Sequence, residues 1–416
     1  MRAWLLGAAL AIGSPGCSGA PDPRPVAEDP VCKAEGDLGC VRVRVDERTP
    51  RASYRGATWY FCAERCRLKF EKDPGRYVPG PERIRVSDDR KGFVTESGAP
   101  FVPWGFNYDH DEAGRLLEDY WEAEWPKVEE DFAEMKALGA NVVRIHLQFA
   151  KFMRSPEAPD GAALDRLGRL LGLAERVGLH LDLTGLGCYH KKDVPAWYDA
   201  MGEAARWEAQ ARFWEAVAEV GARSAAVFCY DLMNEPVAPA GAPGKDWLGP
   251  AFGGKHFVQR ISLDLAGRKR PEVARAWIAR LVRAVRKHDQ KAMVTVGLVD
   301  WSLDRPGLTS GFVPSEVAGE LDFLAVHLYP RKGKLDEALE TLRGFAIGKP
   351  VVVEETFVLH CGADELEDFL RRSRGVASGW IGFYWGRTAE ECRRSGTMGD
   401  AITASWLDLF RKGPPR

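Results

Sequence analysis

Two glutamates stand at the ends of apolar runs of the sequence. Glu235 closes the run Asp231-Leu232-Met233-Asn234-Glu235, and Glu355 closes Val351-Val352-Val353-Glu354-Glu355. Two carboxylates that reach one bond can divide the work of an acid and a nucleophile, because one protonates the leaving oxygen while the other attacks or stabilises the carbon that loses it. The pair is a candidate for acid/base and nucleophilic catalysis at one bond if the fold brings both glutamates to one place.

The elements that must position them are alternating strands and helices from residue 84 to 416. Strands are predicted at Phe101–Tyr108, Asn141–Leu147, Leu179–Thr184, Val227–Asn234, Met293–Val299, Phe323–Tyr329, Pro350–Glu355 and Trp380–Trp385, after a hairpin at Gly92–Phe101. Helical periodicity lies between them at Val128–Leu138, Leu164–Val177, Ala205–Val220, Ala274–His288, Leu335–Phe345 and Asp364–Arg374, and it is weak only after Asp300. This alternation predicts an α/β fold, a (β/α)8 TIM barrel, whose reactive residues stand at the C-terminal ends of the strands. A doubly wound open sheet is disfavoured because no glycine-rich phosphate loop follows an early strand.

Further motifs mark the ends of the other predicted strands. They are Trp104-Gly105-Phe106-Asn107-Tyr108, Asn141-Val142-Val143-Arg144, Asn234-Glu235-Pro236, His327-Leu328-Tyr329 and Trp385. A tripeptide such as Asn-Glu-Pro is a weak motif alone. The ordered set extends across the whole barrel and resembles glycoside hydrolase family 5, within the clan of cellulases and mannanases.

The resemblance implies a retaining β-glycosidase that works by double displacement and needs no cofactor for catalysis. Glu235 would be its acid/base and Glu355 its nucleophile. Strand parity favours Glu355 over Glu354, since Val351, Val353 and Glu355 are expected to share the inner face. Glu354 is then expected to point toward the helices and to form a salt bridge there.

The resemblance also implies a supporting set around the two glutamates. Arg144 and Tyr329 would hold Glu355 ionised, and His327 would bond near the acid/base or the sugar. Asn234 suits a hydrogen bond to the sugar 2-hydroxyl. The remaining expected substrate-binding or supporting residues are Trp104, Asn107, His146 and Trp385, with the two tryptophans as wall and floor of the subsite.

Composition agrees with the uncharged glycan that the resemblance implies as the partner. Lys and Arg total 58 against 60 Asp and Glu, so no basic field argues for nucleic acid. The family's endoglucanases commonly carry a histidine at the end of strand three, where this chain has Thr184. β-Mannan is therefore as plausible a substrate as β-glucan, and the chain is expected to act as a monomer. A long insertion, Val237–Arg270, would make the enzyme exo-acting if it closes one end of the cleft.

A cysteine-rich segment precedes the barrel. Its motifs are Asp29-Pro30-Val31-Cys32, Thr58-Trp59-Tyr60-Phe61-Cys62, Cys66, Phe70 and Asp73-Pro74. The segment resembles a YHS domain, a small module associated with metal-handling proteins, and a small α+β module is expected at 29–80. Cys62 and Cys66 share one helix face and could bind zinc or copper, with Cys32 and Cys40 completing the site. Two disulfides among the four cysteines are the alternative, because an exported domain of this size often needs such staples.

The first residues predict export to the periplasm or the cell exterior. Residues 1–20 form a secretory signal with an apolar run from Trp4 to Ile12, which is too short to span a membrane. The signal is cut after Ala20 or, alternatively, ends in a lipid anchor at Cys17. Residues 21–28, rich in Pro, Ala and Asp, read as a linker.

A different class of function competes with the enzyme. In this alternative the barrel binds carbohydrate with little catalysis, and the cysteine module senses or carries a metal. Glu235 and Glu355 favour the enzyme, because a barrel that only binds has no reason to keep both carboxylates.

Overall fold

A computed structural model describes residues 22, 24–54, 57–78, 80–241, 243–305 and 309–415. The chain forms two compact units, one ending at Pro79 and one spanning Gly80–Arg416. The predicted signal at 1–20, with Cys17, lies outside the described residues. Within the described ranges, no helix has the length and apolar character needed to cross a membrane.

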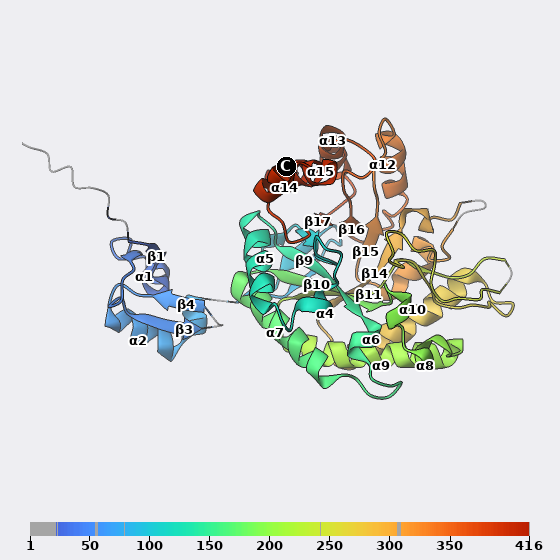
Figure 1. Cartoon of the computed structure of the whole chain (residues 1–416), viewed down its shortest axis with the longest axis horizontal. Helices are drawn as coiled ribbons and strands as arrows, with labels where there is room; N and C mark the ends of the chain where they lie inside the picture. Colours follow the sequence, from blue (N-terminus) through green and yellow to red (C-terminus); the bar gives the residue numbers. More distant parts are fainter. Residues whose placement is uncertain are drawn as a thin grey trace, which may run out of the picture. The chain divides into compact units, whose positions relative to one another are not determined.

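The larger unit is a closed barrel of eight parallel strands (Figure 1). In chain order the strands are β8 (Trp104–Asn107), β9 (Val142–Gln148), β10 (His180–Gly187), β11 (Val227–Asn234), β14 (Met293–Val299), β15 (Leu324–His327), β16 (Val351–Glu355) and β17 (Gly379–Phe383). Each strand pairs with the next, and β17 closes the ring on β8 with Trp380 opposite Trp104. The TIM-barrel prediction is confirmed.

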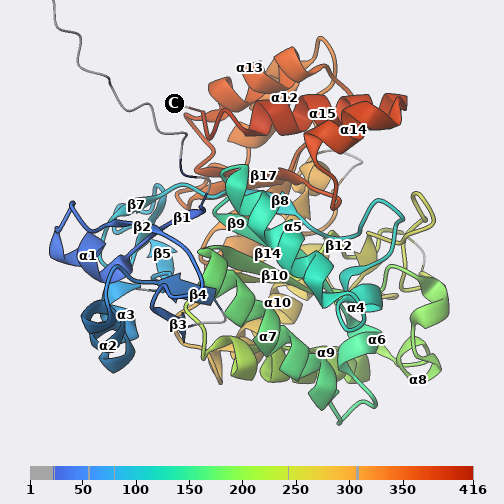
Figure 2. The same ribbon diagram turned by 60° about the vertical axis from the view of Figure 1, so that its left-hand side comes forward.

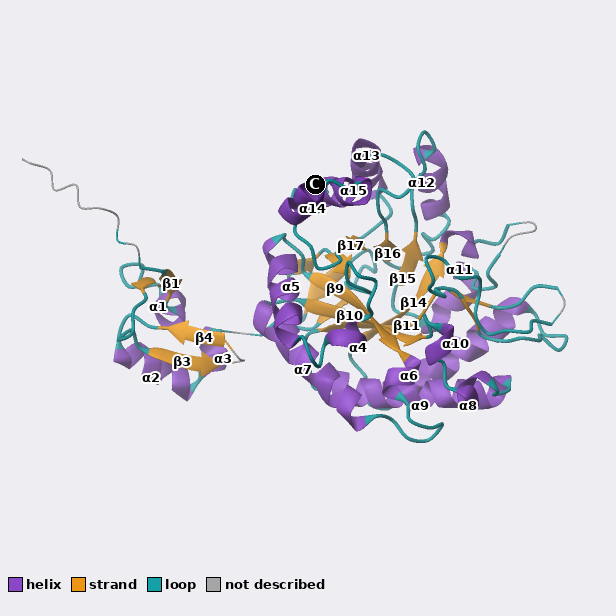
Figure 3. Cartoon of the chain, viewed as in Figure 1, coloured by secondary structure: helices purple, strands orange, loops and turns teal. Residues whose placement is uncertain are grey.

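Helices surround these strands (Figure 3). The main ones are α5 (Trp125–Ala137), α7 (Gly161–Val177), α9 (Glu203–Gly221), α10 (Arg270–Arg286), α12 (Leu335–Arg343), α13 (Ala363–Ser373) and α15 (Met398–Phe410). The interval after β14 holds the short α11 (Pro314–Val317), as the weak periodicity predicts. Helices α12, α13, α14 (Ala389–Ser395) and α15 lie together in Figure 2.

Apolar side chains fill the barrel at the N-terminal ends of its strands. Val142, Met293 and Val352 belong to this cluster. A three-stranded sheet of β5 (Ile84–Val86), β6 (Phe93–Thr95) and β7 (Pro100–Phe101) contributes Phe93, which packs edge-on against Phe228 and Phe323. Because this end is filled, a site can form only at the opposite, C-terminal ends of the strands.

The insertion between β11 and α10 is fastened to the helix layer. It contains the short paired strands β12 (Pro236–Val237) and β13 (Gln259–Arg260). The guanidinium of Arg206 on α9 lies between two aromatic rings, 3.6 Å from the Tyr198 ring centre and 4.4 Å from that of Trp247 in the insertion. This sandwich holds the insertion beside the barrel mouth.

The smaller unit is an α+β module. Its elements are β1 (Val26–Glu28), α1 (Pro30–Glu35), β2 (Arg42–Arg44), β3 (Arg51–Tyr54), β4 (Ala57–Tyr60), α2 (Glu64–Lys72) and α3 (Pro74–Tyr77). Phe70 of α2 packs on Phe61 at 5.0 Å and forms the centre of a small aromatic core. The linker expected at 21–28 is shorter than predicted, because β1 pairs with β2 through the register Val26 to Arg44.

Loss of the Arg206 sandwich should loosen the insertion. Arg206→Ala is expected to lower the free energy of unfolding by about 2 kcal/mol, since a desolvated cation–π contact is lost. Chemical denaturation measures this change, and limited proteolysis should show faster cutting within residues 243–258. The matched control is Arg212→Ala on the same helix, where the side chain is 42% exposed. Equal behaviour of the two variants would contradict the role given to Arg206.

Candidate active site

Arg144 on β9 is the centre of the site at the C-terminal mouth of the barrel. Its side chain is fully buried and donates from Nη1 to Asn107 (2.9 Å) and Glu355 (2.6 Å). Its Nη2 donates to Asp231 (2.8 Å) and Asn234 (3.0 Å). Burial lowers the pKa of Arg144, but the surrounding carboxylates outweigh burial and hold the pKa well above its usual value. One permanent cation thus joins the ends of β8, β11 and β16.

The two glutamates lie close together beside His327. One oxygen each of Glu235 and Glu355 and one ring nitrogen of His327 lie within 4.8 Å of one another. His327 Nδ1 is 3.0 Å from Glu235 Oε1, and Tyr329 Oη donates to Glu355 Oε2 at 2.7 Å. Retaining glycosidases separate their carboxyl groups by ~5–5.5 Å, so the geometry suits retention.

Glu235 adopts an unusual backbone conformation. Its φ is +47°, in the left-handed region that residues other than glycine rarely occupy. The pairing of β11 with β14 is irregular between Asp231 and Asn234, and Glu235 N donates to Gly297 O at 3.0 Å. The irregular strand end turns the Glu235 side chain into the pocket, and strain of this kind is typical of functional sites.

The orientation predicted for Glu354 was wrong. Val351 and Val353 pack in the helix-layer core, so Glu354 lies inside the barrel and is fully buried. Glu355 reaches the pocket because the pairing of β16 with β15 is irregular and passes from Val353 to Glu355, which lies opposite His327. Simple alternation therefore fails at the strand end that carries the candidate nucleophile.

Glu354 belongs to a buried group of three carboxylates that the sequence analysis did not identify. One oxygen each of Glu354, Asp182 and Asp231 lies within 4.8 Å of the others. Neither oxygen of Asp182 has a hydrogen-bond partner among the described residues. Burial, and after it the charge of Glu354, raises the pKa of Asp182 well above its usual value, which favours the protonated form of this carboxyl. Asp182 lies two residues before Thr184 on β10, so strand alternation places both side chains on the same, inner face of the barrel. This alternation was the sequence signal that could have identified Asp182.

His327 is held between carboxylates on both sides of its ring. Nδ1 faces Glu235, and Nε2 lies 3.3 Å from Glu354 Oε2. Burial lowers the pKa of His327, but the carboxylates of Glu355, Glu235 and Glu354 outweigh burial and raise the pKa to about 10. The ring is therefore an imidazolium at neutral pH and donates from both nitrogens.

Asn107 and His146 support the site from β8 and β9. Asn107 Nδ2 donates to the backbone oxygens of Glu354 (2.9 Å) and Gly382 (2.8 Å). His146 contacts Asn107 Oδ1 at 3.4 Å and the hydroxyl of Tyr189. Burial, and then the charge of Arg144, lowers the pKa of His146 well below its usual value, so the ring is neutral.

Above the glutamates lies a pocket of about 470 Å³. Tyr329, Phe383 and Trp385 form a row of near-parallel rings along it, with interplanar angles of 23°. The insertion supplies Pro250, Phe252, Phe257 and Val258, while strand ends supply Asp109, His110, His146 and Asn234. Asn234 is fixed between Arg144 and Phe257 O, which accepts from its Nδ2 at 3.1 Å. Asp109, His110 and Phe383 are pocket residues that the sequence motifs did not indicate.

The prediction that Trp104 forms a wall of the subsite was wrong. Its ring is 1% exposed and stacks on Phe410 of α15 at 4.5 Å. Its Nε1 donates to Phe410 O at 3.2 Å. Asn107 faces into the barrel, so Trp104, three residues earlier, faces outward.

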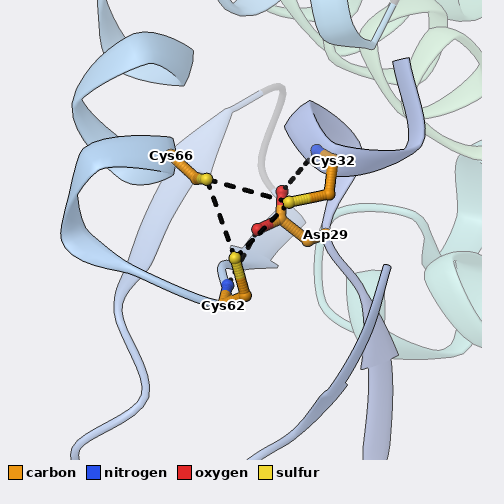
Figure 4. Close-up of side chains that lie close together, drawn as sticks. All are labelled: Asp29, Cys32, Cys62 and Cys66. Atoms are coloured by element: carbon orange, nitrogen blue, oxygen red, sulfur yellow. Dashed lines mark hydrogen bonds between the residues drawn. The ribbon is translucent and has the colours of Figure 1, made fainter. Parts of the chain in front are cut away.

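The cysteine module brings three thiols together (Figure 4). The Sγ atoms of Cys32, Cys62 and Cys66 are separated by 3.4, 3.8 and 3.7 Å. Four sulfurs around zinc, each with a bond of ~2.3 Å, lie about 3.8 Å apart, so the triangle fits three corners of a tetrahedron. Asp29 fixes the arrangement, since its carboxylate accepts from the backbone N of Cys32 (3.1 Å) and Cys62 (2.8 Å).

Cys40 is not part of this triangle. It groups with Cys32 and Asp37, while Asp29 is the fourth member of the three-thiol group. The described cysteines are free thiols in this structure, and the two disulfides stay the alternative prediction to a metal site.

The barrel and its paired carboxylates define a class, the (β/α)8 glycosidases. Residues 94–361 match the family Cellulase (glycosyl hydrolase family 5), and residues 42–80 match the YHS domain. The chain belongs to glycosyl hydrolase family 5 and is a glycoside hydrolase that carries a YHS domain ahead of its barrel.

Solved structures of a similar fold include three that are named as a mannosidase or as mannanases. Exo-β-1,4-mannosidase Op5Man5 from Opitutaceae bacterium strain TAV5 aligns with a TM-score of 0.57 and 18% identity, over 71% of this chain and 54% of that chain. β-1,4-Mannanase from the sea hare Aplysia kurodai gives 0.55 and 16%, over 77% and 99%. β-Mannanase from the blue mussel Mytilus edulis gives 0.53 and 15%, over 80% and 98%. No curated protein matches the chain.

The raised pKa of His327 predicts how stability depends on pH. A histidine whose pKa rises from 6.5 to about 10 on folding contributes stability below pH 6.5 that is lost as pH rises toward 10. The destabilisation caused by His327→Gln should therefore shrink between these pH values, as measured by urea unfolding at several pH values. His360→Gln, which removes an exposed histidine outside this network, is the control. A difference between wild type and His327→Gln that does not change with pH would refute the charged state.

Proposed function

We propose that the barrel hydrolyses β-mannans or related β-mannosides by double displacement with retention, with β-glucans as the second substrate class. The observation that carries the proposal is the approach of Glu235 and Glu355 to within 4.8 Å beside one histidine. The mannan preference is supported by the names of the structural neighbours.

The side chains divide the reaction between them. Glu355, held by Arg144 and Tyr329, attacks the anomeric carbon while Glu235 protonates the leaving oxygen. The glycosyl–Glu355 ester is then cleaved by a water that Glu235 deprotonates. His327 bonds to Oε1 of Glu235, which leaves Oε2 to carry the transferred proton. The row of Tyr329, Phe383 and Trp385 offers apolar faces for a sugar ring.

The same site argues against a barrel that only binds carbohydrate. The charges of Arg144 and His327 are costly to bury and are matched to the carboxylates beside them. A binding site needs hydroxyl partners and aromatic faces, but it has no use for two carboxylates, Glu235 and Glu355, that both lie at Nδ1 of one charged histidine.

We also infer that the module binds one soft metal ion, zinc or copper, through Cys32, Cys62 and Cys66. Their spacing and buried position support three thiolate ligands, and a fourth ligand would come from Asp29 or from outside the chain.

Export is the proposed setting for both parts. The signal-like residues 1–20 support it, with Cys17 as the candidate lipid site or Ala20 as the last residue removed. Mass spectrometry of the mature N-terminus distinguishes a lipid-modified cysteine from a free end.

Replacement of each glutamate should separate its role from the other. Glu355→Ala is expected to lower kcat on aryl β-mannosides by at least about 1,000-fold, because no covalent intermediate forms. With substrates that have good leaving groups, Glu235→Ala should still form the glycosyl–Glu355 intermediate but should hydrolyse it more slowly than wild type, because no base activates the water. Azide should rescue Glu235→Ala to a β-glycosyl azide and Glu355→Ala to an α-glycosyl azide, as read by NMR. The opposite anomers would exchange the two roles.

Metal binding should depend on the thiol triangle. The reduced full-length chain is expected to bind one equivalent of Zn²⁺ or Cu⁺, and Cys62→Ser should weaken binding at least about 10-fold because a soft thiolate is lost. Cys361→Ser, which removes a half-buried thiol of the barrel, is the matched control. Anaerobic titration with metal analysis measures both. Equal binding by the two variants would contradict the site.

A further inference from the structure

Asp109 has an incomplete set of hydrogen bonds at the edge of the active-site pocket. It follows β8, lines the pocket and is 4% exposed. Its Oδ2 lies 2.8 Å from His110 Nδ1. Its Oδ1 is buried and has no donor among the described residues.

The same loop shows what a structural aspartate looks like. Asp111, two residues later, accepts at Oδ1 from the backbone N of Ala113 (3.0 Å) and Arg115 (2.9 Å). Its Oδ2 accepts from Arg115 Nε at 2.8 Å. Both carboxylate oxygens of Asp111 therefore accept hydrogen bonds within the loop, whereas Oδ1 of Asp109 accepts none from the described residues.

The charge on Asp109 makes this oxygen a strong acceptor. Burial raises the pKa of its carboxyl, but the charge and the hydrogen bond of His110 outweigh burial and lower the pKa to about 2. An ionised oxygen that is buried without a donor destabilises the protein. A ligand that brings donors into the pocket would remove this deficit.

We propose that Asp109 binds the sugar ring that reacts at Glu355, with Oδ1 accepting hydrogen bonds from its hydroxyl groups. The inference rests on the proposed glycosidase function and adds a specificity-determining residue to it. His110 holds the carboxylate through Oδ2, and its ring lies 5.9 Å from that of Trp385 in the same pocket. The sugar ring would thus stack on the face of Trp385, while its hydroxyl groups donate hydrogen bonds to Asp109. A carboxylate suits neutral sugars, whose hydroxyls are donors.

The test compares parent and deoxy substrates in wild type and variants. Nitrophenyl β-mannoside is assayed beside analogues that each lack one ring hydroxyl. Asp109→Ala should lower kcat/KM for the parent by about 10- to 100-fold, as expected for the loss of a hydrogen bond to a charged group. On the analogue without the contacted hydroxyl, wild type and Asp109→Ala should be nearly equal, because the interaction is already absent. Asp109→Asn keeps the shape and an acceptor, so its loss should be smaller.

Control measurements separate binding from folding. Thermal unfolding shows whether each variant is folded. If Asp109→Ala does not fold, the comparison with wild type is made with Asp109→Asn. Asp364→Ala, an exposed acidic change on α13, should behave as wild type. Unchanged kcat/KM, or the same fold-loss on the parent and on every deoxy analogue, would overturn the proposal.

Failure of the proposed function gives a different result. A wild-type chain that cleaves no aryl glycoside contradicts the glycosidase, and the role of Asp109 is then decided by calorimetric binding of methyl β-mannoside. Weaker binding to Asp109→Asn than to wild type supports the subsite. Equal binding, or no binding to wild type, refutes it.

Discussion

The buried charge of Arg144 is the constraint on which the site depends. A guanidinium with no exposed surface needs acceptors for its donors, and Asn107, Asp231, Asn234 and Glu355 supply them from three strands to both Nη atoms, while Nε has no partner among the described residues. Each of these acceptors is thereby fixed in place. Gly297 belongs to the same constraint, because a Cβ there would lie 3.0 Å from both Arg144 Nη2 and His327 Nε2. The hydrogen bonds and ion pairs of Arg144 thus fix the positions of the side chains at the mouth of the barrel.

Both candidate catalytic glutamates leave their strands at irregular positions. The left-handed backbone at Glu235 and the irregular pairing before Glu355 turn these side chains toward each other. The remaining carboxylates are buried beneath them, where burial and the charge of Glu354 raise the pKa of Asp182 and where Glu354 faces His327. The strands hold the backbone rigid, and the irregular positions at their ends orient the two glutamate side chains.

The cysteine module uses a different physical principle. Its core is small, with Val31, Phe61 and Phe70 fully buried or nearly so, and its three thiols cluster at the junction of α1, β4 and α2. A soft metal at that junction would tie the three elements together, which suits a domain with little apolar surface to bury. The barrel, with its much larger core, has no such need.

The barrel, its strand order and most of the site follow from local pattern, because strand alternation, helical periodicity and motifs such as Asn234-Glu235-Pro236 are properties of neighbouring residues. The residues that local pattern misplaced, Trp104 and Glu354, are those whose facing depends on where a strand begins and where its pairing becomes irregular. Asp109, Asp182 and Gly297 carry no motif, and their importance arises from what lies across the barrel from them. The sequence by itself determined the fold, the family and the two glutamates. The tertiary structure alone decided which side chains share the buried charge, since that depends on distances between strands far apart in the chain.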